Sequence, residues 1–540
     1  RRGFQASRKT DYRTPMIRLT ELRLPLNHPE DALRAAVLGR LGIGDAALQA
    51  MHVFRRGYDA RKPQAIMLVY TLDCEVADEA ALLARHAGDQ RIGPAPDTGY
   101  RFVARAPEGI RRPVVVGTGP CGFMAALLLA QMGFRPLILE RGKVVRERTK
   151  DTWGLWRRGV LNPESNVQYG EGGAGTFSDG KLYSQIRDPR HYGRKVLAEF
   201  VKAGAPEEIL YVSKPHIGTF RLVSMVEHIR AEIEALGGEY RFGARVDDLI
   251  IEAGTDGTRR LRGLVLQDGE VIEADHAILA LGHSARDSFA MLHARGVAMQ
   301  AKPFSIGVRI EHPQGMIDRA RFGPNAGNPL LGAADYKLVH HAKNGRAVYS
   351  FCMCPGGTVV AATSEPGRVV TNGMSQYSRN ERNANAGIVV GIDPRDYPGD
   401  DPLAGMRLQR ELESRAYVLG GSTYEAPGQL VGDFIAGRPS IEFGEVQPSY
   451  KPGVKLGDLH QALPAYAIEA MREALPLFGR KIAGFDRHDA VLTGVETRTS
   501  APGIRRAISS AASRVQRASR SPTIRSVGAA IRGSSVRVSC

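Results

Sequence analysis

Cysteine is scarce in this chain, with five residues among 540: Cys74, Cys121, Cys352, Cys354 and Cys540. So few cysteines over this length exclude a disulfide-stapled fold and favour a reducing compartment, which predicts a cytoplasmic protein. Long hydrophobic runs are scarce too: the charge-free stretch 113–134 is interrupted by glycines, and its helical part is too short to span a bilayer. No apolar signal-peptide core follows the basic residues 1–13. We therefore expect no membrane partner.

Acidic residues are absent from 501–540, where eight arginines contribute a charge of +8. Residues 1–15 contribute a further +4, so 16–500 carry only +4 of the formal net charge of +16. A nucleic-acid-binding surface would therefore depend on the two ends of the chain and not on a basic groove. A nucleic-acid partner is not expected. The hydrophobic fraction of 43% over this length indicates two or three packed domains.

A glycine-rich turn at 117–122 is the clearest motif. Gly117, Gly119 and Gly122 form a G-x-G-x-x-G that follows a Val-Val-Val strand and opens an apolar helix, and the next strand ends at Glu140. The first glycine permits the turn, the second lets the backbone approach a diphosphate at the helix N-terminus, and the third allows close packing. An acid at the end of the second strand accepts hydrogen bonds from an adenosine ribose. The motif predicts a bound dinucleotide, and the alternative is a structural turn without nucleotide.

The segments after this unit favour FAD over NAD as the dinucleotide. A strand pattern at 241–251 is followed by a hairpin pattern at 261–272 and by a buried strand that ends at Gly282. This order resembles flavoproteins with two dinucleotide folds, in which a strand ending in glycine passes close to the FAD. The other G-x-G-x-x-G, at 170–175, follows no strand pattern, so a second strand–turn–helix unit for a dinucleotide is missing and NAD(P)H would visit the flavin only transiently.

Four longer motifs carry a resemblance to a known family. They are YGEGGAGTFSDGKL at 169–182, FCMCPGG at 351–357, VTNGMS at 370–375 and TGVETRTS at 493–500. Over 16–500 the chain resembles a largely uncharacterised family of bacterial FAD-dependent dehydrogenases, related to geranylgeranyl-reductase-like and other glutathione-reductase-type flavoproteins. The resemblance implies FAD as the cofactor and names no substrate.

The glycines of the first of these motifs have a physical use. Gly170, Gly172, Gly173 and Gly175 offer backbone N–H groups without side-chain obstruction, which suits the FAD diphosphate or the flavin pyrimidine. Lys181 adds a positive charge that would stabilise a reduced, anionic flavin. The alternative for these glycines is a flexible surface loop.

Cys352 and Cys354 are the candidate catalytic residues. A C-x-C spacing is too tight for the C-x-x-C redox geometry, and no second Cys or His cluster completes a zinc site, so no metal is expected. Residues two apart in an extended segment point to the same side, so both thiols could face one pocket. The alternative is that they are small packing residues before a Pro-Gly-Gly turn.

The C-terminal half also has polar residues that could line a pocket, which the sequence does not rank. They are Arg309, Glu311, Ser364, Glu365 and Asn372. The histidines at 283, 340 and 341 are interpreted as structural residues.

The predicted domain boundaries follow these motifs. They are a disordered tail at 1–15, a small N-terminal α+β domain at 16–106, an FAD-binding domain at 107–301, a substrate or cap domain at 302–484, a return to the FAD-binding domain at 485–500 and a basic disordered tail at 501–540. The family pattern is expected to continue past TRTSAP with a strand and a glycine-rich helix N-terminus, and this chain departs from it. We hypothesise that the reading frame shifts after Pro502. The alternative is a genuine basic tail that binds RNA or an acidic membrane.

The sequence thus predicts an α/β protein with an FAD-binding Rossmann-like domain of the glutathione-reductase type, a small N-terminal α+β domain and an inserted substrate or cap domain. Its expected function is an FAD-dependent oxidoreductase that passes hydride through flavin to or from an unknown small molecule. The alternatives are an FAD-dependent RNA-modifying enzyme and a non-catalytic nucleotide-binding protein whose cofactor binding is impaired. The predicted cofactor-binding residues are Gly117, Gly119, Pro120, Gly122, Glu140, Arg141, Gly172, Gly173, Lys181, Val246 and Gly282.

Overall fold

The structure is a computed structural model that describes residues 16–184, 186–255, 257–399, 401–498 and 503–504. Within these ranges the chain folds into two compact units. The tail expected at 1–15 lies outside the described residues, and so does the tail expected at 501–540 with its hypothetical frame shift, apart from 503–504.

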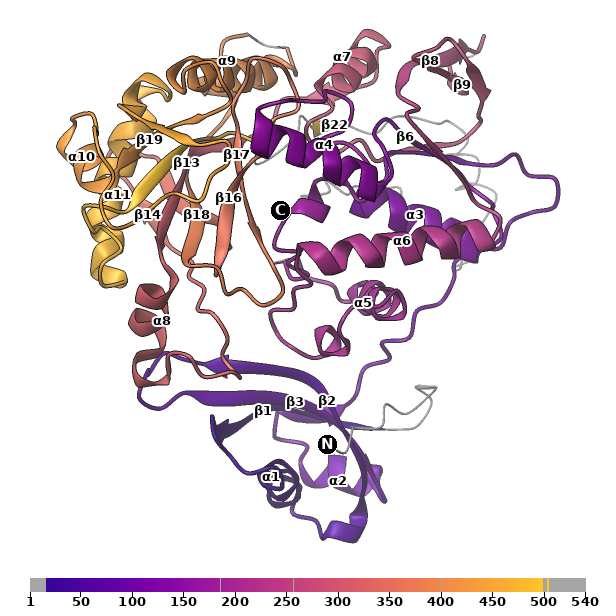
Figure 1. The fold of residues 1–540 in the computed structure, drawn as a ribbon. Helices are drawn as coiled ribbons and strands as arrows, with labels where there is room; N and C mark the ends of the chain where they lie inside the picture. The colour runs from indigo at the N-terminus through magenta and orange to yellow at the C-terminus, as the bar shows by residue number, and fades with distance from the viewer. Residues whose placement is uncertain (1–15, 185, 256, 400, 499–502, 505–540) are drawn as a thin grey trace. The chain divides into compact units, whose positions relative to one another are not determined.

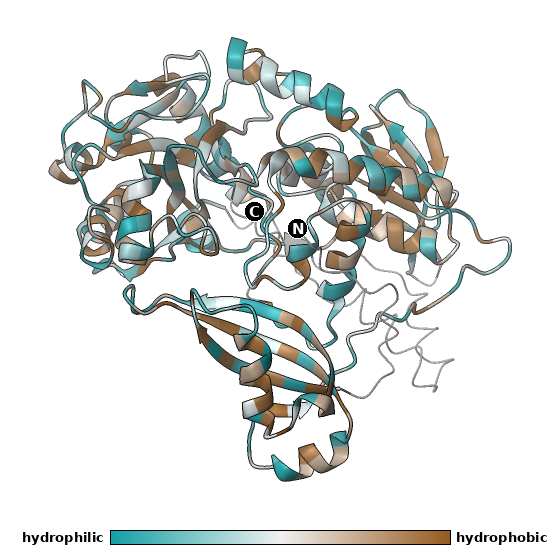
Figure 2. Ribbon diagram, turned by 60° about the horizontal axis from the view of Figure 1, so that its bottom comes forward, coloured by the Kyte–Doolittle hydropathy of each residue, from teal (hydrophilic) through white to brown (hydrophobic). Residues whose placement is uncertain are grey.

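The first unit combines an antiparallel sheet with short helices (Figure 1). Its elements are β1 (Ile17–Pro25), α1 (Ala32–Leu41), η1 (Asp45–Ala47), β2 (Leu48–Asp59), β3 (Met67–Val76), α2 (Glu79–Arg85), β4 (Ile92–Pro94), α5 (Tyr192–Lys202), η3 (Glu207–Leu210) and η4 (Gly323–Asn325). The strand order is β2-β3-β1-β4. More and less buried side chains alternate along β1, as expected for a sheet with one face on a core, and Figure 2 shows hydrophobic and hydrophilic positions succeeding one another along these strands.

Two later segments of the chain also belong to this first unit, namely 181–216 and 321–332. Both segments fall inside the FAD-binding and cap domains predicted from the sequence. Backbone hydrogen bonds join Arg56 on β2 to Tyr211 at 2.6 Å and to Ser213 at 2.8 Å. Pairing between positions so distant in sequence leaves no local pattern, so motifs alone do not reveal it.

The second unit contains a parallel sheet built on the predicted βαβ segment. The elements of this part are β5 (Val114–Val116), α3 (Pro120–Gln131), β6 (Leu137–Glu140), α4 (Val145–Arg158), η2 (Gly173–Phe177), α6 (Thr219–Ala235), β7 (Glu239–Phe242) and β11 (Ala277–Leu279). The strand order is β11-β5-β6-β7, with every pairing parallel. The buried valines of β5 favour a strand, and Pro120 suits the first turn of a helix, so the helix begins three residues before the apolar run at Phe123.

A mixed sheet forms the rest of the core of the second unit. Its strands and the neighbouring helices are β13 (Phe304–Pro313), α8 (Gln314–Phe322), β14 (Val339–His341), β15 (Ala347–Cys354), β18 (Asn383–Ile392), η5 (Pro394–Asp396), α9 (Ala404–Leu419), β19 (Ala426–Leu430), α10 (Val431–Ala436), β20 (Val454–Leu456), η6 (Leu459–Gln461), α11 (Ala465–Lys481) and β21 (Val491–Glu496). The strand order is β14-β15-β18-β13-β21-β19-β20. Nearly all of β13 and β18 is buried, with α11 against β15 and β18, and α9 against β19 and β21.

Smaller sheets of two or three strands complete the second unit. The remaining elements are β8 (Val246–Ala253), β9 (Arg259–Leu266), β10 (Val271–Glu273), α7 (Arg286–Ala294), β12 (Met299–Gln300), β16 (Gly357–Ala361), β17 (Thr371–Ser375) and β22 (Gly503–Ile504). The predicted hairpin at 261–272 is confirmed by the antiparallel pairing of β9 with β10. None of the helices in the described ranges has both the length and the apolar character that crossing a bilayer requires.

We predict that Gly122→Ala lowers the free energy of unfolding by about 2–3 kcal/mol, because a Cβ built on Gly122 would overlap the carbonyl oxygen of Gly117. Denaturant unfolding of the purified variant measures this change. Gly457→Ala is the matched control, since nothing lies within 4 Å of a Cβ built there. Equal stability of the two variants would contradict the packing described.

Candidate functional site

The turn between β5 and α3 requires glycine at two positions for packing reasons. Gly117 has a φ of +97°, and a Cβ built on it would overlap the carbonyl oxygen of Ala280. A Cβ on Gly122 would overlap the carbonyl oxygen of Gly117. Gly119 differs, because a Cβ built there would lie 3.7 Å from the Cα of Gly173, an ordinary contact. Packing therefore does not require glycine at 119, as expected if that position faces a ligand.

The N-terminus of α3 presents unused hydrogen-bond donors. Pro120 is the first residue of the helix, and both it and Cys121 are exposed. Among the described residues, the N–H groups of Gly119, Cys121 and Gly122 donate to no acceptor. The helix macrodipole adds partial positive charge at the same place. This donor set fits a diphosphate group.

The glycine-rich segment 170–175 packs backbone to backbone against this turn. The N–H of Gly172 donates to the carbonyl oxygen of Thr118 at 2.9 Å. Gly173 has a φ of +60°, and a Cβ built on it would lie 2.6 Å from the Cα of Gly119. The segment is therefore a packed wall of the site and not a loose surface loop.

Glu140 is buried at the end of β6 and accepts four hydrogen bonds from its own chain. Its Oε2 accepts from the N–H of Thr118 at 2.9 Å and from the Thr118 hydroxyl at 2.7 Å. Its Oε1 accepts from the N–H groups of Gly142 at 2.8 Å and Gly170 at 3.0 Å. A carboxylate has about four acceptor positions, so a ribose hydroxyl would have to replace one of these donors. The contact of Glu140 with a ribose stays a prediction. The structure shows instead that Glu140 joins the turn at Thr118 to the glycine-rich segment at Gly170.

Arg148 on α4 is fully buried and binds backbone carbonyls. Its Nε donates to Asn166 at 2.7 Å, its Nη2 to Val167 at 2.7 Å and its Nη1 to Glu171 at 2.7 Å. Burial lowers the pKa of Arg148 to about 10, and nearby carboxylates oppose that shift, so the side chain is charged at neutral pH. The planar guanidinium serves several carbonyls at once, which a compact ammonium cannot do. Arg148 thus fixes the segment that leads into 170–175.

Glu171 joins the same loop to two helices. Its Oε2 accepts from the N–H of Val145, in the first turn of α4, at 2.8 Å. Its Oε1 forms an ion pair with Arg230 on α6 at 2.7 Å. The carboxylate thereby accepts a hydrogen bond from a free N–H group at the start of α4 and also neutralises the charge of Arg230.

Arg141, predicted to bind the cofactor, is held by other side chains. It forms ion pairs with Glu164 and Asp287, both at 2.9 Å, and its guanidinium carbon lies 4.0 Å from the ring centroid of Tyr169. Burial opposes the charged form, but the hydrogen bonds that Arg141 donates to the two carboxylates raise its pKa. A direct contact of Arg141 with a cofactor stays a prediction.

Three further predicted residues have different surroundings. Val246 is buried in the hydrophobic core with Val114 and Leu139. Gly282 follows β11, is exposed and has a φ of +72°. Lys181 belongs to the first unit, where it pairs with His216 in an isolated bridge. Their roles at the cofactor remain predictions.

Cys352 and Cys354 lie where β15 is irregular. The register with β18 shifts between Phe351 and Cys354, and Cys352 has a φ of +44°, in the left-handed region. The regular alternation assumed for this segment is therefore not present. Cys352 is half-buried and Cys354 is buried, and the Cys354 Sγ donates to the carbonyl oxygen of Cys352 at 3.4 Å.

Arg309 on β13 is fully buried and holds this irregular segment. Its Nη1 donates to the carbonyl oxygen of Cys352 at 2.9 Å and to Asn385 at 3.1 Å. Its Nη2 donates to Asn372 at 3.2 Å, and its Nε forms an ion pair with Glu496 at 2.9 Å. Every nitrogen of the guanidinium is thus bound by the chain itself.

A second buried ion network was not found from the sequence. Glu413 on α9 is fully buried between Arg286 on α7, at 2.7 Å, and Arg498, at 2.9 Å. Arg286 also pairs with Glu365 at 2.7 Å. Burial alone would raise the pKa of Glu413, but the guanidinium groups of Arg498 and Arg286 hold it well below its usual range. The one sequence signal was the position of Arg498 in the TGVETRTS motif.

The polar residues expected to line a pocket are distributed over these networks. Arg309 and Asn372 bind each other, and Ser364 accepts from Arg498 at 2.7 Å. Glu311 is buried and accepts from Ser449. The structure therefore shows them in contact with the chain itself.

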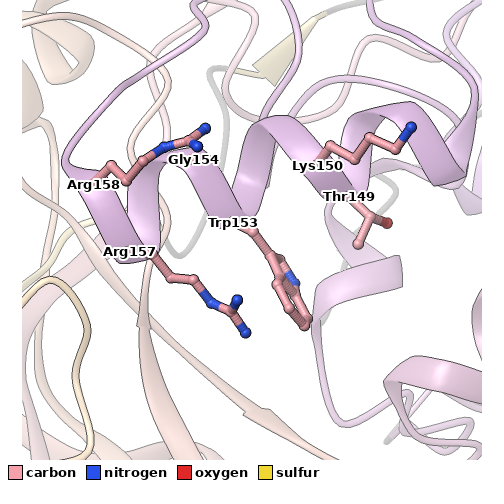
Figure 3. A pocket seen from close by; sticks show the side chains of 6 residues that line it. All are labelled: Thr149, Lys150, Trp153, Gly154, Arg157 and Arg158. Atoms are coloured by element: carbon pink, nitrogen blue, oxygen red, sulfur yellow. The ribbon is translucent and has the colours of Figure 1, made fainter.

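A cavity of about 470 Å³ lies along α4, and its lining residues belong to none of these networks. Figure 3 shows Trp153 and Arg157 pointing to the same side, with the Arg157 guanidinium carbon 3.9 Å from the Trp153 ring centroid. Its lining residues are Thr149, Lys150, Trp153, Gly154, Arg157 and Arg158. None of the predicted site residues is among them.

Comparison with known sequences places the chain among relatives. A protein of Clostridium beijerinckii that carries the description "Uncharacterized protein" is 45% identical over 488 residues, which is 90% of this chain and 90% of the relative. The chain belongs to the family of that protein. Residues 303–499 match the family model described as FAD-dependent protein, C-terminal domain-like, and residues 16–75 match a domain of unknown function. This chain thus carries a domain similar to the C-terminal domain of FAD-dependent proteins.

Two solved structures are remotely similar to this chain. Thermovibrio ammonificans THI4 is 20% identical, with 35% of this chain and 66% of that chain covered and a TM-score of 0.24. A flavoprotein/dehydrogenase from Cytophaga hutchinsonii is 14% identical, with 57% of this chain and 61% of that chain covered and a TM-score of 0.27. The match spans less than two thirds of either solved chain, and likenesses of this strength carry no argument.

The site residues fit a dinucleotide better than a metal ion. The unused N–H donors at the start of α3 suit phosphate oxygens, and Gly119 leaves the backbone open to them. Throughout the described part of the chain, no group of three or more His, Cys, Asp or Glu side chains is placed to hold a metal.

We predict that Glu413→Gln lowers the free energy of unfolding by about 3–5 kcal/mol at neutral pH, because two buried guanidinium groups lose their counter-charge. The folded-state pKa of Glu413 is depressed, so its contribution is present above about pH 4 and is lost as the pH falls. Denaturant unfolding at several pH values should show the gap between wild type and variant shrinking with acidification. Glu411→Gln, an exposed position on the same helix, serves as control. A gap independent of pH would contradict the network.

Arg148→Lys is expected to loosen the segment 166–171, since an ammonium cannot reach the carbonyls that the guanidinium binds. Amide hydrogen exchange there should accelerate, and stability should fall by about 3 kcal/mol. The exposed Arg157→Lys change on the same helix should leave both within about 0.5 kcal/mol of wild type. Unchanged exchange in Arg148→Lys would show that the loop does not depend on this side chain.

Proposed function

We propose that the chain is an FAD-dependent oxidoreductase with an FAD-binding Rossmann-like domain of the glutathione-reductase type. The observation that carries the proposal is the match of 303–499 to the family model described as FAD-dependent protein, C-terminal domain-like. The parallel βαβ unit at 114–140 supports it, because its turn has the donors that a diphosphate requires. A bound flavin would supply hydride transfer to or from a small molecule, with NAD(P)H as a transient donor.

The residues of the turn bind and orient the cofactor in this proposal. The N–H groups of Gly119, Cys121 and Gly122 donate to phosphate oxygens, and the missing side chain at Gly119 permits that approach. Arg148 and Glu140 hold the glycine-rich segment against the turn. The positions of the donors are thus set before the cofactor arrives, which reduces the ordering that binding requires.

The partner is proposed to be a small molecule in the cytoplasm, not a nucleic acid or a membrane. The weak net charge of +4 over 16–500 supports this choice, because a nucleic-acid surface needs a concentrated basic patch. A scarcity of cysteine supports a reducing compartment.

The proposal predicts that the purified full chain binds FAD, seen as flavin absorption bands, and that these bands bleach when an anaerobic reductant such as NADPH or NADH is added. Gly119→Ala should weaken FAD binding about tenfold or more while the free energy of unfolding without FAD stays near that of wild type, because the new methyl makes only an ordinary contact with the protein.

Gly457→Ala provides the control and should keep its flavin. A wild-type chain that remains colourless after incubation with FAD would refute the cofactor. Normal flavin binding by Gly119→Ala would place the diphosphate elsewhere.

A further inference from the structure

The β15 segment that carries the two neighbouring cysteines is compressed. From Phe351 to Cys354 it advances three residues while β18 advances two, from Gly387 to Asn385. Three residues therefore cover the length of two extended ones, about 7 Å. Cys352 also has a φ of +44°, which residues other than glycine rarely adopt. Strained positions of this kind concentrate at functional sites.

The compression shortens the backbone spacing between the two cysteines. Cα atoms of bridged cysteines lie about 4.4–6.8 Å apart, and residues two apart in a fully extended chain reach about 7 Å, so shortening moves the pair into the range. The Sγ of Cys354 already lies 3.4 Å from the carbonyl oxygen of Cys352. Cys352 is half-buried and Cys354 is fully buried. The pair thus combines a half-buried cysteine with a fully buried one.

A buried cation lies beside the pair. A Cβ built on Gly373 would lie 2.5 Å from the Nη1 of Arg309 and 2.9 Å from the Sγ of Cys354, so both atoms lie against the same glycine. A guanidinium at this place stabilises a thiolate, and the thiolate is the nucleophile in disulfide exchange.

Polar atoms around the cation have no hydrogen-bond partner. Within the residues described, these atoms include the buried Nδ2 of Asn385 and the hydroxyl groups of Tyr336 and Thr493. Asn385 pairs in register with Cys354, and Thr493 pairs in register with Arg309. Unsatisfied buried groups are rare and accompany redox or catalytic sites or ordered water. The surroundings of Cys354 are therefore polar, unlike those of a packing cysteine.

We propose that Cys352 and Cys354 form a redox-active dithiol that exchanges with small-molecule disulfides. This role goes beyond the flavin function and does not depend on it. The Cys352 thiolate attacks one sulfur of a disulfide RSSR, whose S–S bond breaks, and the released thiolate takes up the proton that Cys352 lost. The Cys354 thiolate then attacks the Cys352 sulfur and releases a second thiol, which takes the proton of Cys354. Two protein thiols are oxidised to one disulfide, and RSSR is reduced to two RSH.

The test treats the reduced full chain with glutathione disulfide and maps the products by peptide mass spectrometry. Wild type should lose two hydrogens in the peptide that holds both cysteines, with no lasting glutathione adduct there. Cys354→Ser should keep one glutathione on Cys352, because the resolving thiol is missing. Cys352→Ser should show neither product at this site. Cys74→Ala removes a cysteine of the first unit, outside the pair, and should leave the wild-type result unchanged.

An unreactive pair in wild type, or a lasting adduct on Cys352 without the internal disulfide, would overturn the proposal. If circular dichroism shows that serine at the buried position disrupts the fold, Cys354→Ala tests the same step. The products do not involve flavin, so a chain that failed to bind FAD would refute the proposed function and leave this result intact.

Discussion

The guanidinium of Arg148 is buried against backbone carbonyls instead of a carboxylate, and the candidate site is built around it. Burying a charge is costly unless its donors are satisfied, so the carbonyls of 166–171 must stay where the guanidinium can reach them. Glu140 restrains the same loop by accepting the N–H of Gly170. The glycine-rich segment therefore lies against the turn before α3 because two buried charges leave it little freedom.

Buried ion networks have a similar role in the C-terminal part of the second unit. Glu413 joins α7 and α9 to the residues that follow β21, and Arg309 joins β13 to β15 and to the end of β21. Paired buried charges add little net stability compared with apolar packing, yet each becomes costly when its partner is removed. Their main effect here is to fix how distant segments meet, including the strained backbone at Cys352.

Local patterns predicted several elements well. The valine run became β5, and the apolar run after the glycine turn became α3. β2 was missed, because its residues are mostly half-buried and include charged side chains, so that neither a clean alternation nor an apolar run marks it. The bulge at 351–354 was missed for a different reason: it arises from register against β18, which no property of β15 alone reveals.

The sequence by itself determined the glycine turn, the parallel βαβ unit around it and the residues that resemble an FAD-dependent family, because these depend on neighbours within a few tens of residues. Only the tertiary structure decided that the carboxylate oxygens of Glu140 accept hydrogen bonds from the chain itself. It also decided that Arg148 supports the segment 166–171 and that Glu413 lies between two arginines. Those contacts join residues from separate elements, and their hydrogen bonds form only when folding brings the elements together.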